Sequence, residues 1–108
     1  MTHDEKNRLA AEKVMGWKWC DDCELFVSDS APFLEIESWN PCTSIADAWR
    51  LVEKMVRDEF CVLVTLLYHD GKLHADCSVN RDDSFNEAQA DTAPLAITMA
   101  CLKAVGVL

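Results

Sequence analysis

The chain has 108 residues, half of them hydrophobic, and a formal net charge of −9 at pH 7. This length suits one domain that buries a core without disulfides or metal ions, and it excludes two full domains. The negative charge repels phosphate backbones and anionic lipids, so we expect neither direct nucleic-acid binding nor membrane attachment. The charged N-terminus lacks the apolar stretch of a secretory signal, which predicts a cytoplasmic location. We therefore expect one soluble domain over residues 1–108.

The N-terminal part of the chain predicts one helix followed by two short strands. Apolar residues recur at helical spacing from His3 to Met15, and Gly16 ends this helix. Residues Glu24 to Ser28 and Pro32 to Glu37 have the composition of short strands. The second of these segments alternates between apolar and acidic residues, which is typical of a strand with one wet face.

A second helix is predicted from residue 44 to about residue 58. Ser44 and Asp47 have the spacing of a capping box, which satisfies the free N–H groups of a first helical turn. Apolar residues repeat along one face, namely Ile45, Ala48, Trp49, Val52, Met55 and Val56. Because Trp49 lies on this stripe, we expect its side chain in the core. Trp17, Trp19 and Trp39 flank turns instead, so we expect them to close the ends of the core or to form an interaction patch.

The next segments predict a β-hairpin followed by a loop. Residues Phe60 to Tyr68 and Leu73 to Val79 have strand composition, and a turn signal separates them. The first strand is apolar on both faces, so we expect it in the middle of a sheet that is covered on both sides. Residues Asn80 to Ala90 are polar, which favours a loop.

A last helix is predicted from Ala93 to about residue 105, with Asp91 or Thr92 as its cap and Pro94 in its first turn. It is apolar nearly all round, so it must be buried on more than one face. A neighbouring helix or a second copy of the chain can cover that second face, and a homodimer through this helix is one outcome. Together the elements predict an α+β fold, a three-layer α-β-α sandwich with three helices and a small, mainly antiparallel sheet.

Three segments of the chain together resemble the phage ABA sandwich domain family. They are Arg8 to Trp17, Trp39 to Trp49, and Ala90 to Ile97. The resemblance covers nearly the whole chain, and it implies an α-β-α layered protein of bacteriophages and prophages, in the cytoplasm of a bacterial host. It implies no settled activity. The third segment also has a local explanation, because Thr92 and Pro94 favour helix initiation on their own.

We predict neither catalysis nor a cofactor. None of the three histidines neighbours a serine or cysteine in a nucleophile motif, and three glycines provide no phosphate-binding loop. Cys20 and Cys23 have the spacing of two zinc ligands, but no second such pair exists. The residues available to complete a zinc site are Cys42, Cys61, Cys77, His69 and His74. This incomplete set favours thiols without metal, and a zinc-stabilised structural module is an alternative hypothesis.

The charge distribution indicates an acidic binding surface. Residues 20–48 contain seven acidic residues and no Lys or Arg, and residues 58–91 contain eight acidic residues against two basic ones. The predicted partner-binding residues lie in loops, near the sheet edge and at one tryptophan: Asp21, Asp22, Glu24, Glu35, Glu37, Trp39, Asp82 and Asp83. Such a surface complements a basic groove. The leading hypothesis is a phage accessory protein that binds and inhibits a bacterial host protein, such as a nucleic-acid-handling defence effector, in the manner of an anti-CRISPR protein.

A second hypothesis belongs to a different class. In it, the protein is a sponge that sequesters a nucleotide immune signal in pockets between copies of the chain. The phosphates would then have to meet Arg50, Lys54, Arg57 or Arg81.

Overall fold

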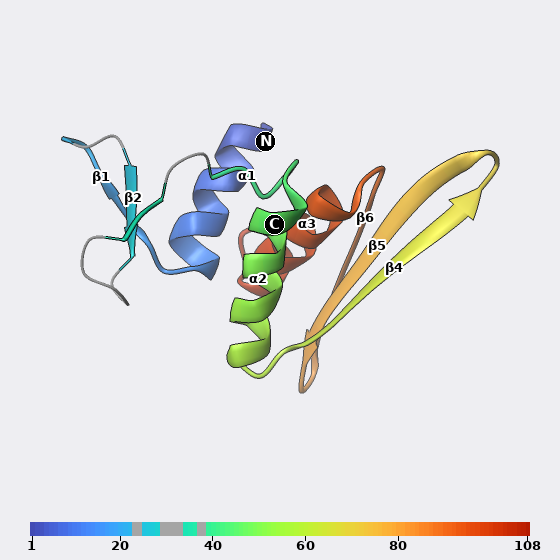
Figure 1. The fold of residues 1–108 in the computed structure, drawn as a ribbon. Coiled ribbons are helices and arrows are strands. Elements are labelled where there is room, and N and C mark those ends of the chain that lie inside the picture. Colours follow the sequence, from blue (N-terminus) through green and yellow to red (C-terminus); the bar gives the residue numbers. More distant parts are fainter. Residues whose placement is uncertain (23–24, 29–33, 37–38) are drawn as a thin grey trace.

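The computed structural model describes residues 1–22, 25–28, 34–36 and 39–108 (Figure 1). In chain order its elements are α1 (His3–Leu9), η1 (Ala10–Val14), β1 (Lys18–Cys20), β2 (Leu25–Ser28), β3 (Leu34–Ile36), α2 (Ile45–Arg57), β4 (Cys61–His69), β5 (Lys72–Arg81), β6 (Ser84–Ala90) and α3 (Ala93–Ala104). The strands form two antiparallel sheets, in the orders β1-β2-β3 and β4-β5-β6. The predicted α+β sandwich of helices and a small antiparallel sheet is confirmed. No helix within these described ranges is long and apolar enough to cross a bilayer.

Helix α3 forms the centre of the core. Strands β5 and β6 contact one side of this helix, and α1, η1 and α2 contact the other. Its buried residues are Ala96, Ile97, Thr98, Ala100, Cys101 and Leu102. The chain's own helices thus cover the second face of α3, for which the sequence allowed either a neighbouring helix or a homodimer.

The first helix ends in a π-helical turn, η1, in which the backbone winds more widely than in an α-helix. The N–H of Met15 donates to the carbonyl of Ala10 at 3.0 Å, and the N–H of Trp17 donates to the carbonyl of Ala11 at 2.9 Å. Gly16 has φ +74°, a left-handed conformation that glycine adopts without steric cost. This turn folds Trp17 back onto Ala11, and both side chains are buried.

Helix α2 begins as predicted, but its orientation differs from the prediction. The hydroxyl of Ser44 accepts a hydrogen bond from the N–H of Asp47 at 3.3 Å. Trp49, however, is 51 % exposed, so its predicted core position is wrong. The residues that α2 buries are Ala48, Leu51, Val52 and Met55. Because α3 and η1 pack against α2, this narrower stripe faces inward, and Ile45, Trp49 and Val56 lie on the outer flank.

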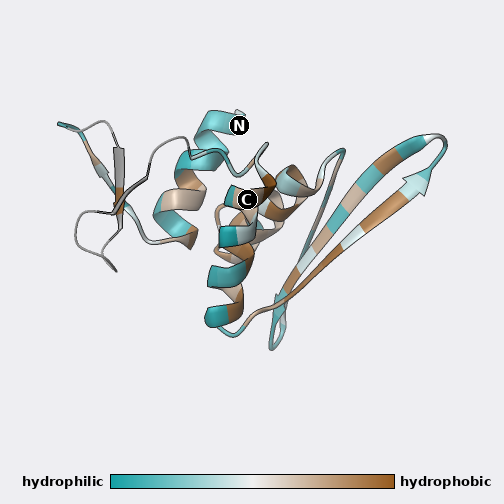
Figure 2. Ribbon diagram, in the orientation of Figure 1, coloured by the Kyte–Doolittle hydropathy of each residue, from teal (hydrophilic) through white to brown (hydrophobic). Residues whose placement is uncertain are grey.

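The predicted central position of the apolar strand β4 is also wrong. Strand β5 is the middle strand, and β4 lies at the edge of the sheet. Ala75, Cys77 and Val79 of β5 are buried on the face that α3 covers. The hairpin of β4 and β5 extends past the helices, and hydrophobic residues follow it outward (Figures 1 and 2). Much of the apolar surface of β4 therefore stays uncovered.

The segment that was predicted as a loop, residues 80–90, continues β5 by two residues and then forms the turn to β6 and β6 itself. The register pairs Cys77 with Ala88 and Ala75 with Ala90, so β6 presents small side chains on the face that packs on α3. Glu87 is exposed on the opposite face. The polar residues that led to the prediction of a loop therefore lie on the solvent-facing side of an edge strand.

Leu51→Ala is expected to lower the free energy of unfolding by about 2–5 kcal/mol, because it opens a cavity at a fully buried position. Trp49→Ala is the control, on the same helix, and is expected to cost about 1 kcal/mol or less because half of its side chain already contacts water. Urea unfolding in dilute, reducing solution measures both. An equal loss of unfolding free energy in the two variants would show that the side chain of Trp49 is buried in the core.

Candidate functional site

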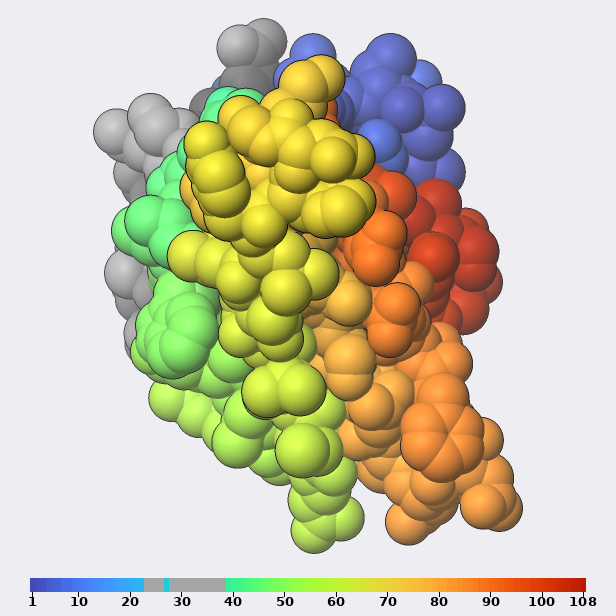
Figure 3. All heavy atoms as spheres, turned by 90° about the vertical axis from the view of Figure 1, so that its right-hand side faces the viewer, coloured from blue at the N-terminus to red at the C-terminus, as the bar shows by residue number. Residues whose placement is uncertain are grey.

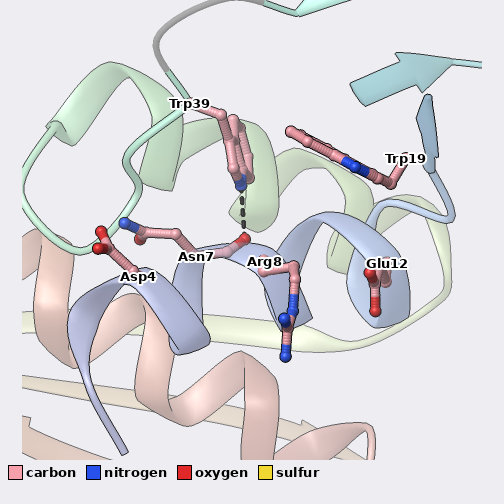
Figure 4. A pocket seen from close by; sticks show the side chains of 6 residues that line it. All are labelled: Asp4, Asn7, Arg8, Glu12, Trp19 and Trp39. Atoms are coloured by element: carbon pink, nitrogen blue, oxygen red, sulfur yellow. Dashed lines mark hydrogen bonds between the residues drawn. The ribbon is translucent and has the colours of Figure 1, made fainter. Parts of the chain in front are cut away.

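A hollow of about 640 Å³ lies between the N-terminal helix and two tryptophans. Its lining residues, which together we call the tryptophan cleft, are Asp4, Asn7, Arg8, Glu12, Trp19 and Trp39 (Figure 4). The first four come from α1 and η1, Trp19 comes from β1, and Trp39 lies six residues before the first residue of α2. Two carboxylates and one guanidinium give the lining a net negative charge.

Asn7 holds one wall of the cleft in place. Its backbone carbonyl accepts a hydrogen bond from the indole Nε1 of Trp39 at 2.8 Å (Figure 4). Its side-chain Nδ2 donates to Oδ1 of Asn40 at 2.8 Å, and its Oδ1 accepts from the backbone N–H of Cys42 at 3.0 Å. Asn7 is buried, so these bonds satisfy polar groups that water does not reach. The indole of Trp39 is thereby fixed relative to α1.

The tryptophans beside the cleft already bind a guanidinium of the chain itself. The rings of Trp17 and Trp39 meet edge to face, with centroids 4.6 Å apart and planes at 69°. The Cζ atom of Arg50, on α2, lies 5.1 Å from the ring centroid of Trp17 and 5.9 Å from that of Trp39. The faces of aromatic rings attract cations. Trp19 borders the cleft from β1 and is 47 % exposed.

The structure separates the acidic residues that the sequence grouped into one surface. Asp21 and Asp22 follow β1, whereas Asp82 and Asp83 form the turn between β5 and β6. These two segments lie at different ends of the molecule (Figure 1). All four side chains are exposed. Of the predicted partner-binding residues, Trp39 lines the tryptophan cleft.

Of the three remaining predicted residues, the structure describes one. Glu35 belongs to β3, and Glu24 and Glu37 lie outside the described residues. Sequence reasoning missed Asp4 and Glu12, which are the carboxylates of the cleft. Their separation of eight residues, about two helical turns, was the available signal, because it places them on one side of a helix.

The buried cysteines are poor nucleophiles. Burial raises the pKa values of Cys42 and Cys101, and it raises the pKa of Cys77 to about 12. Such thiols stay protonated at neutral pH, and the thiolate is the reactive form. Cys20 is half-buried, and Cys23 lies outside the described residues. Within the part of the chain that the structure describes, no three His, Cys, Asp or Glu residues lie close enough together to hold a metal ion.

A second hollow, of about 480 Å³, lies beside the C-terminal end of α2. The structure brings Arg57 and Arg81 together there, next to Phe60, Asp58 and Glu59. The Cζ atom of Arg81 lies 4.2 Å from the ring centroid of Phe60, and its Nη1 donates to the carbonyl of Asp58 at 3.0 Å. Arg81 is therefore held in place, with a second arginine nearby.

Asn7→Ala is expected to lower the free energy of unfolding by about 1–3 kcal/mol, because Asn40 and the N–H of Cys42 lose their partner. Arg8→Ala changes the exposed neighbouring residue and is expected to cost about 0.5 kcal/mol or less. Denaturant unfolding measures both changes. Equal stability of the two variants would show that the side-chain bonds of Asn7 to Asn40 and Cys42 do not stabilise this region.

Comparison with known proteins places this architecture in a family. The family model of the Phage ABA sandwich domain matches residues 8–102. The crystal structure of a phage protein from Bacillus cereus ATCC 14579 is similar to this chain, with a TM-score of 0.74 and 28 % sequence identity, over 97 % of this chain and 88 % of that chain. No curated protein matches. The chain belongs to the Phage ABA sandwich domain family.

Proposed function

We propose that this phage-family protein works by binding, without catalysis, to a bacterial host protein that presents a basic surface, and that it thereby inhibits a host defence. A defence effector that handles nucleic acid, such as a CRISPR nuclease complex, is a partner of this kind because its nucleic-acid channel is basic. The binding takes place in the host cytoplasm. The observation that carries the proposal is the tryptophan cleft, an aromatic and net negative hollow on a chain of net charge −9.

The chemistry of the cleft suits an arginine or lysine side chain of the partner. Asp4 and Glu12 supply carboxylates, which form strong charge-assisted hydrogen bonds with a guanidinium. Trp19 and Trp39 supply ring faces, and the place of Arg50 over Trp39 shows that this ring accepts a cation. Tryptophan is also enriched among the residues that dominate protein–protein binding energy.

The cleft is partly organised before any partner arrives. The hydrogen bond from Trp39 to Asn7 and the edge-to-face contact with Trp17 fix the aromatic wall that Trp39 forms. A side chain that is already ordered loses little rotamer entropy on binding, so more of the contact energy contributes to affinity. Rigid aromatic anchors of this kind favour a specific protein contact over nonspecific attraction between charges.

The acidic turns have a different role in this proposal. Asp21 and Asp22, and Asp82 and Asp83, are exposed and are not among the residues that line the cleft. Exposed charges at the rim of an interface change the association rate and its salt dependence more than the affinity. The turns therefore steer a basic partner toward the chain, and the cleft holds it.

The double variant Asp4→Asn/Glu12→Gln removes both cleft carboxylates with little change of shape. Glu87→Gln/Asp91→Asn removes two exposed charges elsewhere and is the charge-matched control. In quantitative affinity capture from host lysate, we expect the cleft variant to lose at least tenfold of a basic partner, about 1.4 kcal/mol, and the control to retain it. In plating assays, the wild type and the control are expected to protect a phage that the host defence restricts.

Two results would overturn the proposal. One is recovery of no basic host protein by the wild type. The other is equal recovery of the partner by the cleft variant and the control variant. That result would attribute the binding to the net charge of the chain and not to the cleft.

The second candidate function, a sponge for a nucleotide signal, is favoured by one observation. The structure brings Arg57 and Arg81 to one hollow, as contact with phosphates requires. The other two basic residues named for this role have partners within the chain: Lys54 binds Asp58 at 2.6 Å, and Arg50 lies over the tryptophans. The carboxylates of Asp58 and Glu59 border the same hollow and oppose an anion, so this function ranks second.

Thermal-shift measurements with cyclic nucleotides and ADP-ribose derivatives test the sponge. A ligand at a hundredfold excess over its Kd stabilises the fold by about 2.7 kcal/mol, which raises the melting temperature by on the order of 10 °C. The shift should vanish in Arg57→Ala and persist in Lys13→Ala, an exposed basic residue on the N-terminal helical segment. No shift with any compound removes this candidate.

A further inference from the structure

The hairpin of β4 and β5 carries an apolar surface that the rest of the chain leaves uncovered. Leu66, Tyr68 and Leu73 are between 53 % and 77 % exposed, and we call them the hairpin patch. The register pairs Leu66 with Ala75 and Tyr68 with Leu73, so the patch lies on the same face of the sheet as the buried Ala75. That face packs on α3 nearer the body of the protein, and the hairpin extends past the helices (Figure 1). The patch thus lies on the face of the sheet that elsewhere packs on α3, but at a position where no helix of its own chain covers it.

A second uncovered apolar surface lies on α2. Ile45, Trp49 and Val56 are each about half exposed, and we call them the α2 flank. Spacings of four and seven residues place them along one side of the helix. In Figure 3 the end of the hairpin points toward the viewer, with α2 to one side of it. Among the described residues there are therefore at least two uncovered apolar surfaces, one on a strand pair and one on a helix.

We propose that a second copy of this chain covers both surfaces, with the hairpin patch of each copy packed on the α2 flank of the other. Under two-fold symmetry this contact occurs twice, so each chain buries both of its patches. The arrangement also places a partner helix on the part of the sheet that the chain's own helices leave open. The interface differs from a dimer through α3, whose surface the chain itself buries.

The size of the two surfaces supports a stable dimer. Monomers rarely leave large contiguous apolar patches uncovered, and this chain leaves both the hairpin patch and the α2 flank uncovered. A standard interface buries roughly 800 Å² per partner, and this chain offers six large side chains that are half exposed or more. A single small ligand or peptide would cover one patch and leave the other in water.

The charge distribution also favours a second copy at this position. Two chains of net charge −9 repel each other over most of their surfaces. Residues 61–68 of β4 contain no acidic or basic residue, so the β4 side of this contact adds no charge repulsion between two such chains. None of the residues that line the tryptophan cleft belongs to the hairpin patch or the α2 flank, and the hairpin extends away from α1 and β1 (Figure 1).

Light scattering coupled to size-exclusion chromatography tests the proposal on the full chain. At tens of micromolar, the wild type is expected to show twice the 12.2 kDa mass of one chain. Tyr68→Glu and Trp49→Glu, each at an exposed position, are expected to weaken the dimer at least tenfold and to give the single-chain mass. Phe85→Glu is the control, because Phe85 is 79 % exposed, more than either of the two test residues, and belongs to neither patch.

A mixing experiment distinguishes this reciprocal contact from any other interface. A heterodimer of Tyr68→Glu with Trp49→Glu keeps one of its two contacts fully intact, whereas each variant alone keeps none. Mixing the two variants is therefore expected to restore a species of double mass. A wild type of single-chain mass at every concentration overturns the proposal. A dimer that survives both variants, or that mixing fails to restore, overturns it too.

Discussion

The structure depends on the burial of α3. Between Ala93 and Leu108 the only charged residue is Lys103, whose Nζ reaches out to the carbonyl of Glu87 at 2.7 Å. A helix that is apolar nearly all round is stable in water only when other elements cover it on several sides. The β4-β5-β6 sheet covers one side, and α1, η1 and α2 cover the other. The inner surfaces of these elements are buried against α3. Surfaces that can bind a partner therefore lie at the periphery of the fold.

The two peripheral surfaces differ in chemistry. The tryptophan cleft combines carboxylates with indole rings, and the hydrogen bonds of Asn7 order one of its walls. The hairpin patch and the α2 flank consist of apolar side chains. A polar aromatic cleft suits a charged partner, and an apolar sheet face suits permanent burial. A dimer with two open clefts would engage a repetitive partner through two linked contacts, which raises the overall affinity without any new kind of contact.

The orientation of α2 connects these surfaces. Its apolar stripe is wider than the contact with α3 and η1, so the helix buries Leu51 and Met55 and leaves Trp49 outside. The same orientation places Arg50 over the rings of Trp17 and Trp39, beside the cleft. The orientation of α2 therefore leaves the α2 flank exposed, and it also places Arg50 against the aromatic wall of the tryptophan cleft.

The sequence determined the features that depend on neighbouring residues. The capping hydroxyl of Ser44, the glycine at Gly16 and the proline at Pro94 mark helix ends through local backbone chemistry, and the β4-β5 hairpin follows from its turn. Only the tertiary structure decided which apolar residues are buried, because that depends on contacts between distant segments. It left Trp49 half exposed, put β4 at the edge and made a strand of residues 84–90. For the same reason the sequence suggested Trp39 as a site residue but not the carboxylates that the fold places around the same cleft.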